Sequence, residues 1–583
     1  MLYEKWIIPE TDADLQAELS YQLKISPVTA QLLVNRKISD PSAAKVFLNP
    51  SIEHIIDPAC LADIQTAVHR INHAIKNSEN ILVFGDYDVD GITGTAILVS
   101  FFRLTGKTVR TYIPHRLTEG YGLSVKAIEK FKNDNINLII TVDCGVTNVK
   151  EIALAKKLGI DVIVTDHHEP AEELPDAIAI VNPKLRDSKY PFRNVSGATV
   201  AFKLAWALAQ DFSASKKISS VFQDFILESM CFAALGTIAD VVPLIDENRT
   251  IATVGLQLLD KTANKGLKSL IAKNRRNGNG RLTPRDVAFI IAPRINAMGR
   301  MRTADICLEL LLSNHQEKID EILGLMEKSN KERQKKEAEI IIEAELKLKT
   351  EEDIENENII ILSGQGWHQG VIGIVAAKLS EKYFMPVIII STDKDNEFAK
   401  GTVRSCIKAW HATKSLDTVK ECLANYGGHE SAAGFVIARD EIPKLKKKLH
   451  EYANTSLTDD DFSTRLFIDA EILLPSINYM LAREVDKLSP YGSGNPVPVF
   501  ASSGVNIVKG PDIQGQKNDT IAFKISQNNT TLPVVGFFKA HMYDYINAHK
   551  DQPCSIAYEL NINSYFGSET IQLILKDIKF DNS

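Results

Sequence analysis

The sequence predicts an α/β protein made of two lobes and a small C-terminal β-barrel. From Ile81, short apolar runs alternate with helical segments, the pattern of βαβ units around a parallel sheet that is buried on both faces. A second α/β pattern begins at Ile359, after a long charged segment. From Leu466 to Phe580, short β-like runs between Asn-, Gly- and Ser-rich turns indicate a small barrel.

The individual elements follow from these patterns in chain order. In the first lobe the expected strands are Ile81–Phe84, Val109–Ile113, Leu138–Val142, Val162–Thr165 and Ile178–Val181, followed by a more helical stretch from Ala198 to about Leu312. Residues Gln316 to Thr350 have apolar positions at helical spacing and neither Gly nor Pro, so they predict one long connecting helix. The second lobe is expected to have strands at Ile359–Leu362 and Val387–Ile390 around a helix from Val371 to Tyr383. The predicted domains are 1–75 (helical), 76–312 (catalytic), 313–350 (connecting helix), 351–455 (second α/β lobe) and 463–583 (barrel).

Composition excludes several classes of protein. At 583 residues the chain has room for about four domains of roughly 150 residues, and 44% hydrophobic against 24% charged residues excludes global disorder. Sixty-seven Lys and Arg against 74 Asp and Glu give a net charge of −7, which excludes a uniformly basic nucleic-acid surface but not a local basic channel. Seven cysteines without a CxxC pair favour reduced thiols. We find no signal-peptide pattern and no apolar stretch near about 18 residues, and we therefore expect a cytoplasmic protein.

Three aspartates follow the first predicted strand. In Gly85-Asp86-Tyr87-Asp88-Val89-Asp90-Gly91, alternate residues of extended chain share a face, so the carboxylates can converge at the end of the strand, where open α/β sheets bind ligands. An Asp-rich turn is the simpler interpretation. An EF-hand calcium loop is rejected because its twelfth position would be Ile97, where a bidentate Glu is required, and because the preceding run is a strand.

Two further strand ends have residues of the same type. The strand to Val142 ends in Asp143-Cys144-Gly145, and the strand to Thr165 ends in Asp166-His167-His168. A single such Asp is typical of a helix N-cap, but three loops at one sheet edge are hard to explain in that way. Asp240 is a fourth candidate because it lies in an otherwise apolar run, where a charge usually needs a partner or a metal; a helix cap is the alternative.

Charge arithmetic then indicates a cofactor. Asp88, Asp90, Asp143 and Asp240 supply four negative charges, which two divalent ions would balance. Oxygen ligands fit Mg²⁺, and an added imidazole favours Mn²⁺. Two such ions about 3.5–4 Å apart are typical of phosphoryl hydrolysis. The residues alone therefore predict a metal-dependent phosphoester or phosphoanhydride hydrolase.

The same segments resemble a known family. With Thr141–Gly145, Asp166-His167-His168 and Gly236–Leu244, the chain resembles the DHH phosphoesterases, and Gly366–Val375, Lys400–Ser405 and Gly427–Phe435 resemble the DHH-associated domain. The order of these motifs along the chain, together with Tyr112–Gly122 and Pro293–Arg300, is similar to that in bacterial single-stranded-DNA-specific 5′→3′ exonucleases within this superfamily. The resemblance implies a DHH-type parallel-sheet lobe, a smaller DHH-associated lobe and an OB-fold-like barrel.

The resemblance also implies roles for individual residues. The implied metal ligands are Asp88, Asp90, Asp143, His167 and Asp240. The implied catalytic group is His168, which faces the scissile phosphate, with Asp86 and Asp166 in support and Asp166 orienting His167. The implied substrate-binding residues are Arg116, Arg294, Asn296, Arg300, Thr402, Arg404, Gly428 and His429, of which Arg294, Asn296 and Arg300 either line the channel or brace the junction of the lobes. His368 is either a substrate contact or a packed histidine, while Met298 and Trp367 are expected to pack.

This sequence departs from the family pattern at three positions. Cys144 follows the strand-end Asp where Asn is usual, which weakens one hydrogen bond but removes no ligand. Phe84 stands where some relatives have a His ligand, and Thr402 replaces a Ser while keeping the hydroxyl.

The function that the resemblance implies is degradation of single-stranded DNA from its 5′ end to mononucleotides in repair and recombination. The implied partners are single-strand-binding protein and a repair helicase, and the expected state is a monomer. Stacking candidates in the barrel are Phe467, Tyr491, Phe500, Phe523 and Tyr565, although aromatic residues in small barrels usually belong to the core. A phosphodiesterase of short oligoribonucleotides or cyclic dinucleotides, and a non-catalytic strand-binding scaffold, are the alternatives.

Overall fold

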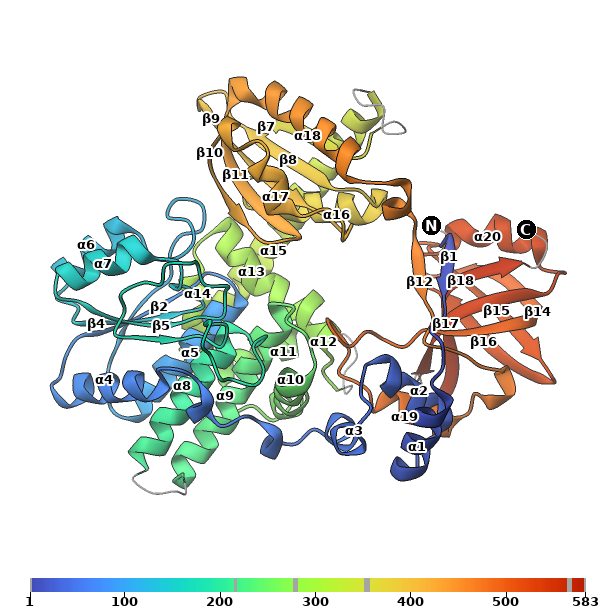
Figure 1. Cartoon of the computed structure of the whole chain (residues 1–583), viewed down its shortest axis with the longest axis horizontal. Coiled ribbons are helices and arrows are strands. Elements are labelled where there is room, and N and C mark those ends of the chain that lie inside the picture. Colours follow the sequence, from blue (N-terminus) through green and yellow to red (C-terminus); the bar gives the residue numbers. More distant parts are fainter. Residues whose placement is uncertain (1–2, 214–217, 276–280, 351–356, 564–568, 581–583) are drawn as a thin grey trace. The chain divides into compact units, whose positions relative to one another are not determined.

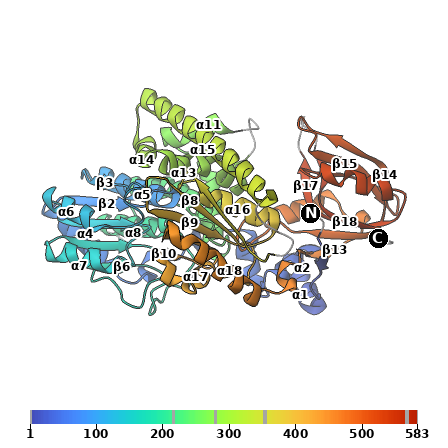
Figure 2. The same cartoon turned by 90° about the horizontal axis from the view of Figure 1, so that it is seen from above.

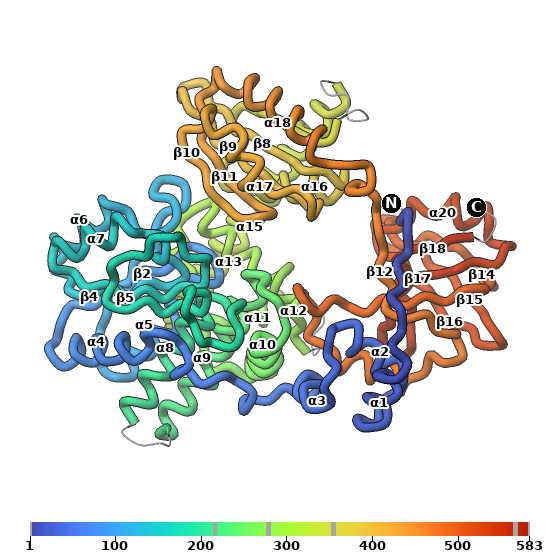
Figure 3. The backbone as a smooth tube through the Cα atoms, viewed as in Figure 1, coloured from blue at the N-terminus to red at the C-terminus, as the bar shows by residue number. Residues whose placement is uncertain are grey.

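The chain forms two compact units, and its path through them can be followed in Figure 3. The computed structural model describes residues 3–213, 218–275, 281–350, 357–563 and 569–580. The barrel unit comprises residues 1–56, 241–254 and 464–583, and the two-lobe unit comprises residues 57–240 and 255–463. The domain boundaries expected from the sequence stay a prediction.

The first lobe of the two-lobe unit is built on a five-stranded parallel sheet, as the sequence predicts (Figure 1). Its order is β3-β2-β4-β5-β6, with bounds Arg110–Tyr112, Ile81–Gly85, Leu138–Val142, Asp161–Thr165 and Ala179–Val181. Every residue of β2 and β4 is buried, which fits apolar strands covered on both faces. The parallel arrangement brings the carboxyl ends of all five strands to one edge.

Helices cover both faces of this sheet. On one face, α6 (Val125–Asn133) and α7 (Val149–Lys157) pack on a core that contains Leu82, Phe84 and Val164. The other helices of this lobe are α4 (Ile64–Lys76), α5 (Val89–Leu104), α8 (Gly197–Phe212), α9 (Ser220–Ala239), α11 (Lys265–Asn274), α12 (Pro284–Asp286), α13 (Ala292–Met301) and α14 (Asp305–Leu312). Residues 246–254 of α10 (Asp246–Leu259) belong to the barrel unit. Among the described residues, α9 is the one helix long and apolar enough to cross a membrane, but it packs against α5 and α8 as a core helix does.

The predicted connecting helix is confirmed as α15 (Gln316–Thr350), which lies against α13 and α16 (Figure 2). The second lobe has the sheet order β10-β11-β9-β8-β7, in which β7 and β8 are parallel and the other pairs antiparallel. The strand bounds are Leu423–Gly428, Ala432–Ala438, Phe398–Arg404, Val387–Thr392 and Ile360–Gln365, and the helices are α16 (Ile372–Tyr383), α17 (Ala412–Asp417) and α18 (Ile442–Ser456). Trp367 and Met298 are buried, as expected, and Trp367 donates its Nε1–H to Glu343 of α15 at 2.8 Å.

The barrel unit contains a closed five-stranded barrel. The strands run in the order β14-β15-β16-β18-β17, and pairing of β14 with β17 closes the barrel. Their bounds are Phe500–Gln514, Thr520–Gln527, Thr530–Gly536, Thr570–Phe580 and Cys554–Asn563, with β13 (Ala470–Glu471), α19 (Tyr479–Asp486) and α20 (Tyr543–His549) alongside. The N-terminal part contributes α1 (Ala13–Leu23), α2 (Pro27–Asn35), α3 (Pro41–Leu48) and a strand that the sequence did not predict, β1 (Lys5–Ile7), which pairs in parallel with β12 (Arg465–Phe467).

The aromatic candidates for base stacking divide by burial. Phe500 and Phe523 belong to the barrel core, and Tyr491 packs against it. Phe467 is 64% exposed, while Tyr565 lies outside the described residues. The rule that aromatic residues of small barrels are usually core therefore explains Phe500 and Phe523.

A buried arginine joins three segments of the barrel unit. Arg249, from α10, donates to the carbonyl oxygens of Phe47 (2.7 Å), Leu488 (2.7 Å), Lys487 (3.0 Å) and Ser489 (2.8 Å). Its guanidinium also lies over the Phe47 ring at 3.9 Å. Because carbonyls at the C-terminal end of α19 are partly negative, they stabilise this cation.

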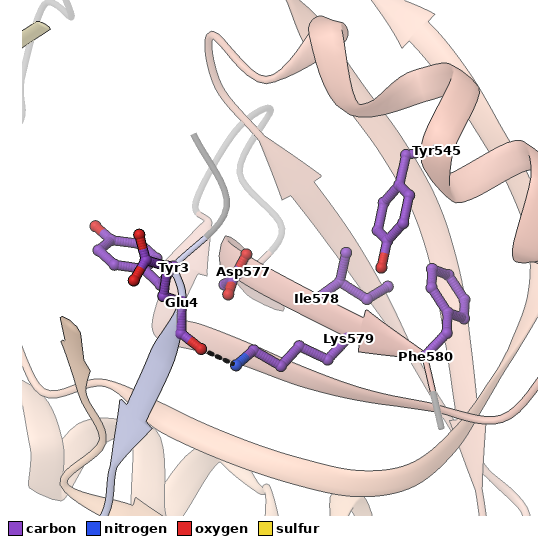
Figure 4. A pocket seen from close by; sticks show the side chains of 7 residues that line it. All are labelled: Tyr3, Glu4, Tyr545, Asp577, Ile578, Lys579 and Phe580. Carbon is purple, nitrogen blue, oxygen red and sulfur yellow. Dashed lines mark hydrogen bonds between the residues drawn. The ribbon is translucent and has the colours of Figure 1, made fainter. Parts of the chain in front are cut away.

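A pocket of about 360 Å³ lies between the N-terminal segment and the last strand of the barrel (Figure 4). Tyr3, Glu4 and Tyr545 line it together with residues 577–580, and Lys579 donates to the Glu4 carbonyl at 3.1 Å. Asp577 accepts the indole N–H of Trp6 at 2.7 Å. These contacts fasten the N-terminal segment to β18.

Candidate metal centre

The predicted carboxylates come together at the carboxyl edge of the first sheet. Three groups of side chains each place a ligand atom from every member within 4.8 Å of the others: Asp86, Asp88 and Asp143; Asp90, His167 and Asp240; and Asp143, His167 and His168. The predicted convergence of three strand ends and Asp240 is therefore present in the described residues.

The loop after β2 is fixed by its own backbone. Asp88 is the N-cap of α5 and accepts from the N–H of Asp90 (2.9 Å) and Gly91 (3.2 Å). Gly91 has no room for a side chain, because a Cβ there would lie 2.6 Å from the backbone of Asp86. The loop thus folds tightly on itself, and the three aspartates end up close together.

Asp90 and Asp143 are held by neighbouring elements. Asp90 accepts from the N–H of Gly197 (2.5 Å) and Ala198 (2.9 Å) at the N-terminus of α8, a position that favours a negative charge. Asp143 has a φ of 62°, a left-handed conformation that Asp adopts more readily than most residues. Gly197 must be small here, because a Cβ would lie 2.6 Å from the Cβ of Asp143.

Asp240 has a setting that capping does not explain. It is the C-cap of α9, where the helix dipole disfavours a carboxylate, so the helix-cap alternative carries an electrostatic cost. Its Oδ2 lies 3.6 Å from Nε2 of His167. A nearby cation would relieve this arrangement.

The electrostatics of the cluster point to missing positive charge. Burial and the Asp88 charge raise the pKa of Asp90 to about 7, and burial with neighbouring carboxylates raises the pKa of Asp86, Asp143 and Asp240 as well. Burial lowers the pKa of His167 to about 3, so its imidazole is neutral. Nε2 of His167 and Oδ1 of Asp143 nevertheless lie 3.0 Å apart, and within the described residues neither atom is paired in a hydrogen bond. A buried imidazole nitrogen that faces a buried carboxylate oxygen fits a shared metal ion.

The predicted role of Asp166 needs a correction. Its Oδ1 accepts from Nδ1 of His168 at 2.8 Å and from the backbone N–H of His167 (2.7 Å) and His168 (3.1 Å), and its Oδ2 accepts from the Val146 N–H at 2.9 Å. The carboxylate therefore orients the ring of His168, and not that of His167, because Nδ1 of His168 faces it. Burial alone would lower the pKa of His168, but the bond to Asp166 and its charge raise it.

The second lobe reaches this centre through His429. Its ring stacks on that of His168 with centroids 5.9 Å apart and an interplanar angle of 16°. Gly428, which precedes it, has a φ of 153°, and a Cβ there would lie 2.4 Å from the backbone of Ala432. His429 is exposed on the same unit as His168, so both imidazoles can face one ligand.

Several arginines gather near the Asp86 end of the cluster. Arg116 lies over the ring of Tyr87 at 4.6 Å. Burial and the charges of Arg116, Arg333 and Arg404 lower the pKa of Arg300 to about 9. Arg404 donates to Thr402 Oγ1 at 2.9 Å and to the Val403 carbonyl at 2.7 Å, but to no carboxylate among the described residues. The group therefore has excess positive charge, which suits an anion.

The remaining candidates have mainly bracing contacts. Arg294 donates to Glu327 of α15 at 3.0 Å, and Arg300 donates to the Gly370 carbonyl at 2.8 Å. Asn296 accepts from the Val89 N–H at 3.2 Å and so helps to cap α5 beside Asp88. His368 accepts from the Gly370 N–H at 3.2 Å. Of the two interpretations left open for Arg294, Asn296 and Arg300, these contacts favour bracing.

The sequence analysis missed three residues at the centre. Tyr121 donates to the Asp143 carbonyl, and its hydroxyl lies 3.0 Å from Nδ1 of His168. Asn182 and Lys184 follow β6. At this edge of the sheet, β2, β4 and β5 are each followed directly by an aspartate, whereas β3 and β6 are not. The end of a predicted strand is the available signal for Asn182 and Lys184, whereas Tyr121 lies in the Tyr112–Gly122 motif, in which the resemblance implies a role for Arg116 alone.

Comparison with known proteins decides the family. The sequence matches the DHH family N-terminal domain over residues 80–233, the DHHA1 domain over 356–455 and the RecJ OB domain over 468–577. It is 36% identical over 576 residues to the single-stranded-DNA-specific exonuclease RecJ of Bacillus subtilis (strain 168), covering 98% of this chain and 70% of that protein. The chain belongs to the RecJ family.

Other RecJ proteins match over most of their length. The RecJ exonuclease of Haemophilus influenzae is 30% identical, with 91% of this chain and 93% of that protein covered. The crystal structure of RecJ from Thermus thermophilus in complex with Mn²⁺ matches with a TM-score of 0.83 at 28% identity, covering 99% of this chain and 80% of that chain. A second structure of that protein, in complex with Mg²⁺, matches with a TM-score of 0.76 at 26% identity, covering 99% of this chain and 79% of that chain. The α/β fold with its DHH-type lobe, DHH-associated lobe and OB-like barrel is thereby confirmed.

Proposed function

We propose that this chain is a metal-dependent exonuclease that degrades single-stranded DNA. The observation that carries the proposal is the convergence of Asp88, Asp90, Asp143, His167 and Asp240 at one sheet edge in a member of the RecJ family. The named activity of its relatives, single-stranded-DNA-specific exonuclease, matches the chemistry that this cluster supports.

The residues present fit a pair of divalent ions. Asp88, Asp90, Asp143, His167 and Asp240 would hold Mn²⁺ or Mg²⁺, the ions named in the related crystal structures. The fit rests on the unpaired imidazole nitrogen of His167 that faces Oδ1 of Asp143 and on the raised pKa values of the carboxylates, both of which a cation would relieve. When bound, two such ions stabilise charge on the phosphate and lower the pKa of water.

The other residues bind and orient. We assign His168, oriented by Asp166, to the scissile phosphate, because its raised pKa keeps a proton available for a developing negative charge or for the leaving oxygen. Asp86, which lies close to Asp88 and Asp143, is assigned a supporting role. His429 contributes a second imidazole from the other lobe, and Gly428 allows the backbone to approach closely.

The arginine group would receive the end of the strand. Arg116 and Arg404 present guanidinium donors that suit a terminal phosphate, and Thr402, which accepts from Arg404, positions that arginine. Arg300, which donates to the Gly370 carbonyl, braces this group. A 5′ terminal phosphate held there would set the direction of degradation as 5′→3′ and release mononucleotides. Arg294 and Asn296 are assigned to holding this group and the Asp88 loop in place.

The cellular setting is also a proposal. We infer action in DNA repair and recombination, on strands presented by a helicase and coated by single-strand-binding protein, by a monomer in the cytoplasm. The OB-like barrel is assigned to binding the single strand, because such barrels bind oligonucleotides by stacking and charge.

A nuclease assay with end-labelled strands tests the function. Wild type should release labelled mononucleotide first from 5′-labelled single strands in Mn²⁺, and Asp143→Ala should lose at least about a thousandfold in rate, because it removes a carboxylate from the cluster. Asp176→Ala, which removes an exposed aspartate of the same lobe, is the control. Cleavage of small dinucleotides and not of longer strands would show that the substrate is a dinucleotide. Binding of single strands without Mn²⁺-dependent cleavage would show that the chain is a non-catalytic scaffold.

A further inference from the structure

The strand end after β6 has no assigned role, although it lies at the same sheet edge as the metal centre. Asn182 follows this strand and is completely buried. Its Nδ2 donates to the His168 carbonyl at 3.0 Å, and its Oδ1 accepts from the Lys184 N–H at 2.8 Å. One side chain therefore fixes the backbone of Lys184 relative to that of His168.

The Lys184 side chain is mostly covered and has a weak partner. Its Nζ lies 3.2 Å from Oε1 of Glu169, the residue that follows His168. The lysine side chain is 19% exposed, whereas the glutamate is 71% exposed. An ion pair with such an exposed partner contributes little stability and exchanges easily for another anion.

Lys184 follows β6 at one edge of the sheet, whereas Arg116 follows β3 at the opposite edge. Burial has the largest influence on the pKa of His167, Asp240 and His429, and the Lys184 charge lowers the pKa of each as well. Arg116, in contrast, acts on Asp86, where burial and Asp88 have larger and opposite effects. The two sources of positive charge thus follow opposite edge strands of the sheet whose carboxyl ends form the metal centre.

A strand cut one nucleotide from its end has three successive phosphates near the site. If the terminal phosphate lies at the arginines and the scissile phosphate at the carboxylates, the next phosphate belongs to the retained strand and lies beyond the His167 end. We propose that Lys184 binds this phosphate, the first one 3′ of the scissile bond, and that Glu169 holds the lysine in place until DNA displaces it. This inference rests on the proposed function and adds a contact that keeps the shortened strand at the site.

The test compares a charge removed from the protein with a charge removed from the DNA. Lys184→Gln should lower kcat/KM about tenfold on a 5′-phosphorylated single strand, the loss expected for one charged hydrogen bond. A strand with an uncharged methylphosphonate at the first phosphate 3′ of the scissile bond should lose a similar factor with wild type. Lys184→Gln acting on the methylphosphonate strand should lower kcat/KM no more than either change alone, because both changes remove the same contact. Lys184→Arg should keep most of the activity.

Two control variants sharpen the test. Arg186→Gln removes a positive charge from an exposed position of the same loop and should leave kcat/KM within about twofold. Glu169→Gln removes the competing anion and should lower KM. The dependence of log Kd on log salt should fall by about 0.7 in Lys184→Gln, as for one phosphate contact on a single strand.

The outcomes separate this inference from the proposed function. Multiplicative losses from Lys184→Gln and the methylphosphonate, or equal behaviour of Lys184→Gln and Arg186→Gln, would overturn the contact while wild type still cleaves DNA. If wild type does not cleave DNA at all, the proposed function fails, and equilibrium binding of the same charged and neutral strands by fluorescence anisotropy still decides whether Lys184 contacts that phosphate.

Discussion

Replacing Asp166 by Asn tests the structure most directly. The carboxylate accepts four hydrogen bonds, three on Oδ1 and one on Oδ2, and it is buried. An amide keeps one acceptor oxygen only. If that oxygen takes the Oδ1 position, the Val146 N–H faces an NH₂ group and is left without an acceptor.

The expected magnitude follows from these contacts. A buried donor left unsatisfied costs about 1–3 kcal/mol, and loss of a charged bond to His168 adds about 1.5–3 kcal/mol. We expect Asp166→Asn to lower the free energy of unfolding by about 3–5 kcal/mol. Because Asp166 also raises the pKa of His168, its loss lets the imidazole deprotonate at lower pH. The rate should fall by roughly a hundredfold, and the basic limb of the pH–rate profile should move to lower pH.

The assay is single-turnover cleavage of a single strand between about pH 6 and 9, with unfolding in urea measured in parallel. Asp161→Asn is a matched control, since Asp161 lies at the other end of β5 and pairs with Arg70 at 2.6 Å in a partly exposed position. That pair should contribute no more than about 1 kcal/mol. A variant Asp166→Asn with an unchanged pH profile and the stability of the control would refute the role given to this carboxylate.

Three further changes have defined outcomes. Without metal, Asp90 has a pKa of about 7 in the folded state and an ordinary pKa near 3.8 when unfolded, so the apo protein should lose stability as the pH rises from about 4 to about 7. Mn²⁺ at a hundred times its Kd should restore about 2.7 kcal/mol, measured as thermal unfolding with Mn²⁺ or EDTA. Tyr121→Phe should lower kcat about fivefold with KM unchanged, since one hydrogen bond beside His168 is lost; a change confined to KM would contradict this. Arg249→Met should cost about 3–5 kcal/mol in urea unfolding, because four carbonyls lose their donor, and an unchanged midpoint would show that water replaces the guanidinium.

The sequence predicted the parts of this fold that depend on local pattern. Apolar runs of β2, β4 and β5 followed by Asp identify both the sheet and its functional edge, and Asp240 was noticeable because a charge interrupts an apolar helix. The partner of Asp166 was predicted wrongly, because which of two adjacent histidines faces a carboxylate depends on loop dihedrals that spacing does not reveal. The β1–β12 pairing joins segments some 460 residues apart, and three-residue strands carry too little pattern to predict it.

Asn182 and Lys184 show a different limit. The β6 strand was predicted, but its end has no acidic residue or histidine, so a search for metal ligands passes over it. An amide that positions two backbones becomes visible only once both hydrogen bonds are known.

The way Arg249 fastens residues 241–254 into the barrel unit matters for anyone who wishes to isolate that unit. The unit is assembled from three separate stretches of chain, so a fragment that starts near residue 464 lacks both α3 and the arginine that satisfies the end of α19. In such a fragment the carbonyls of residues 487–489 would lack the Arg249 guanidinium as donor. Strand-binding measurements on it would therefore describe a destabilised barrel. Grafting residues 241–254 back through a short linker, together with residues 1–56, is the shortest route to an intact one.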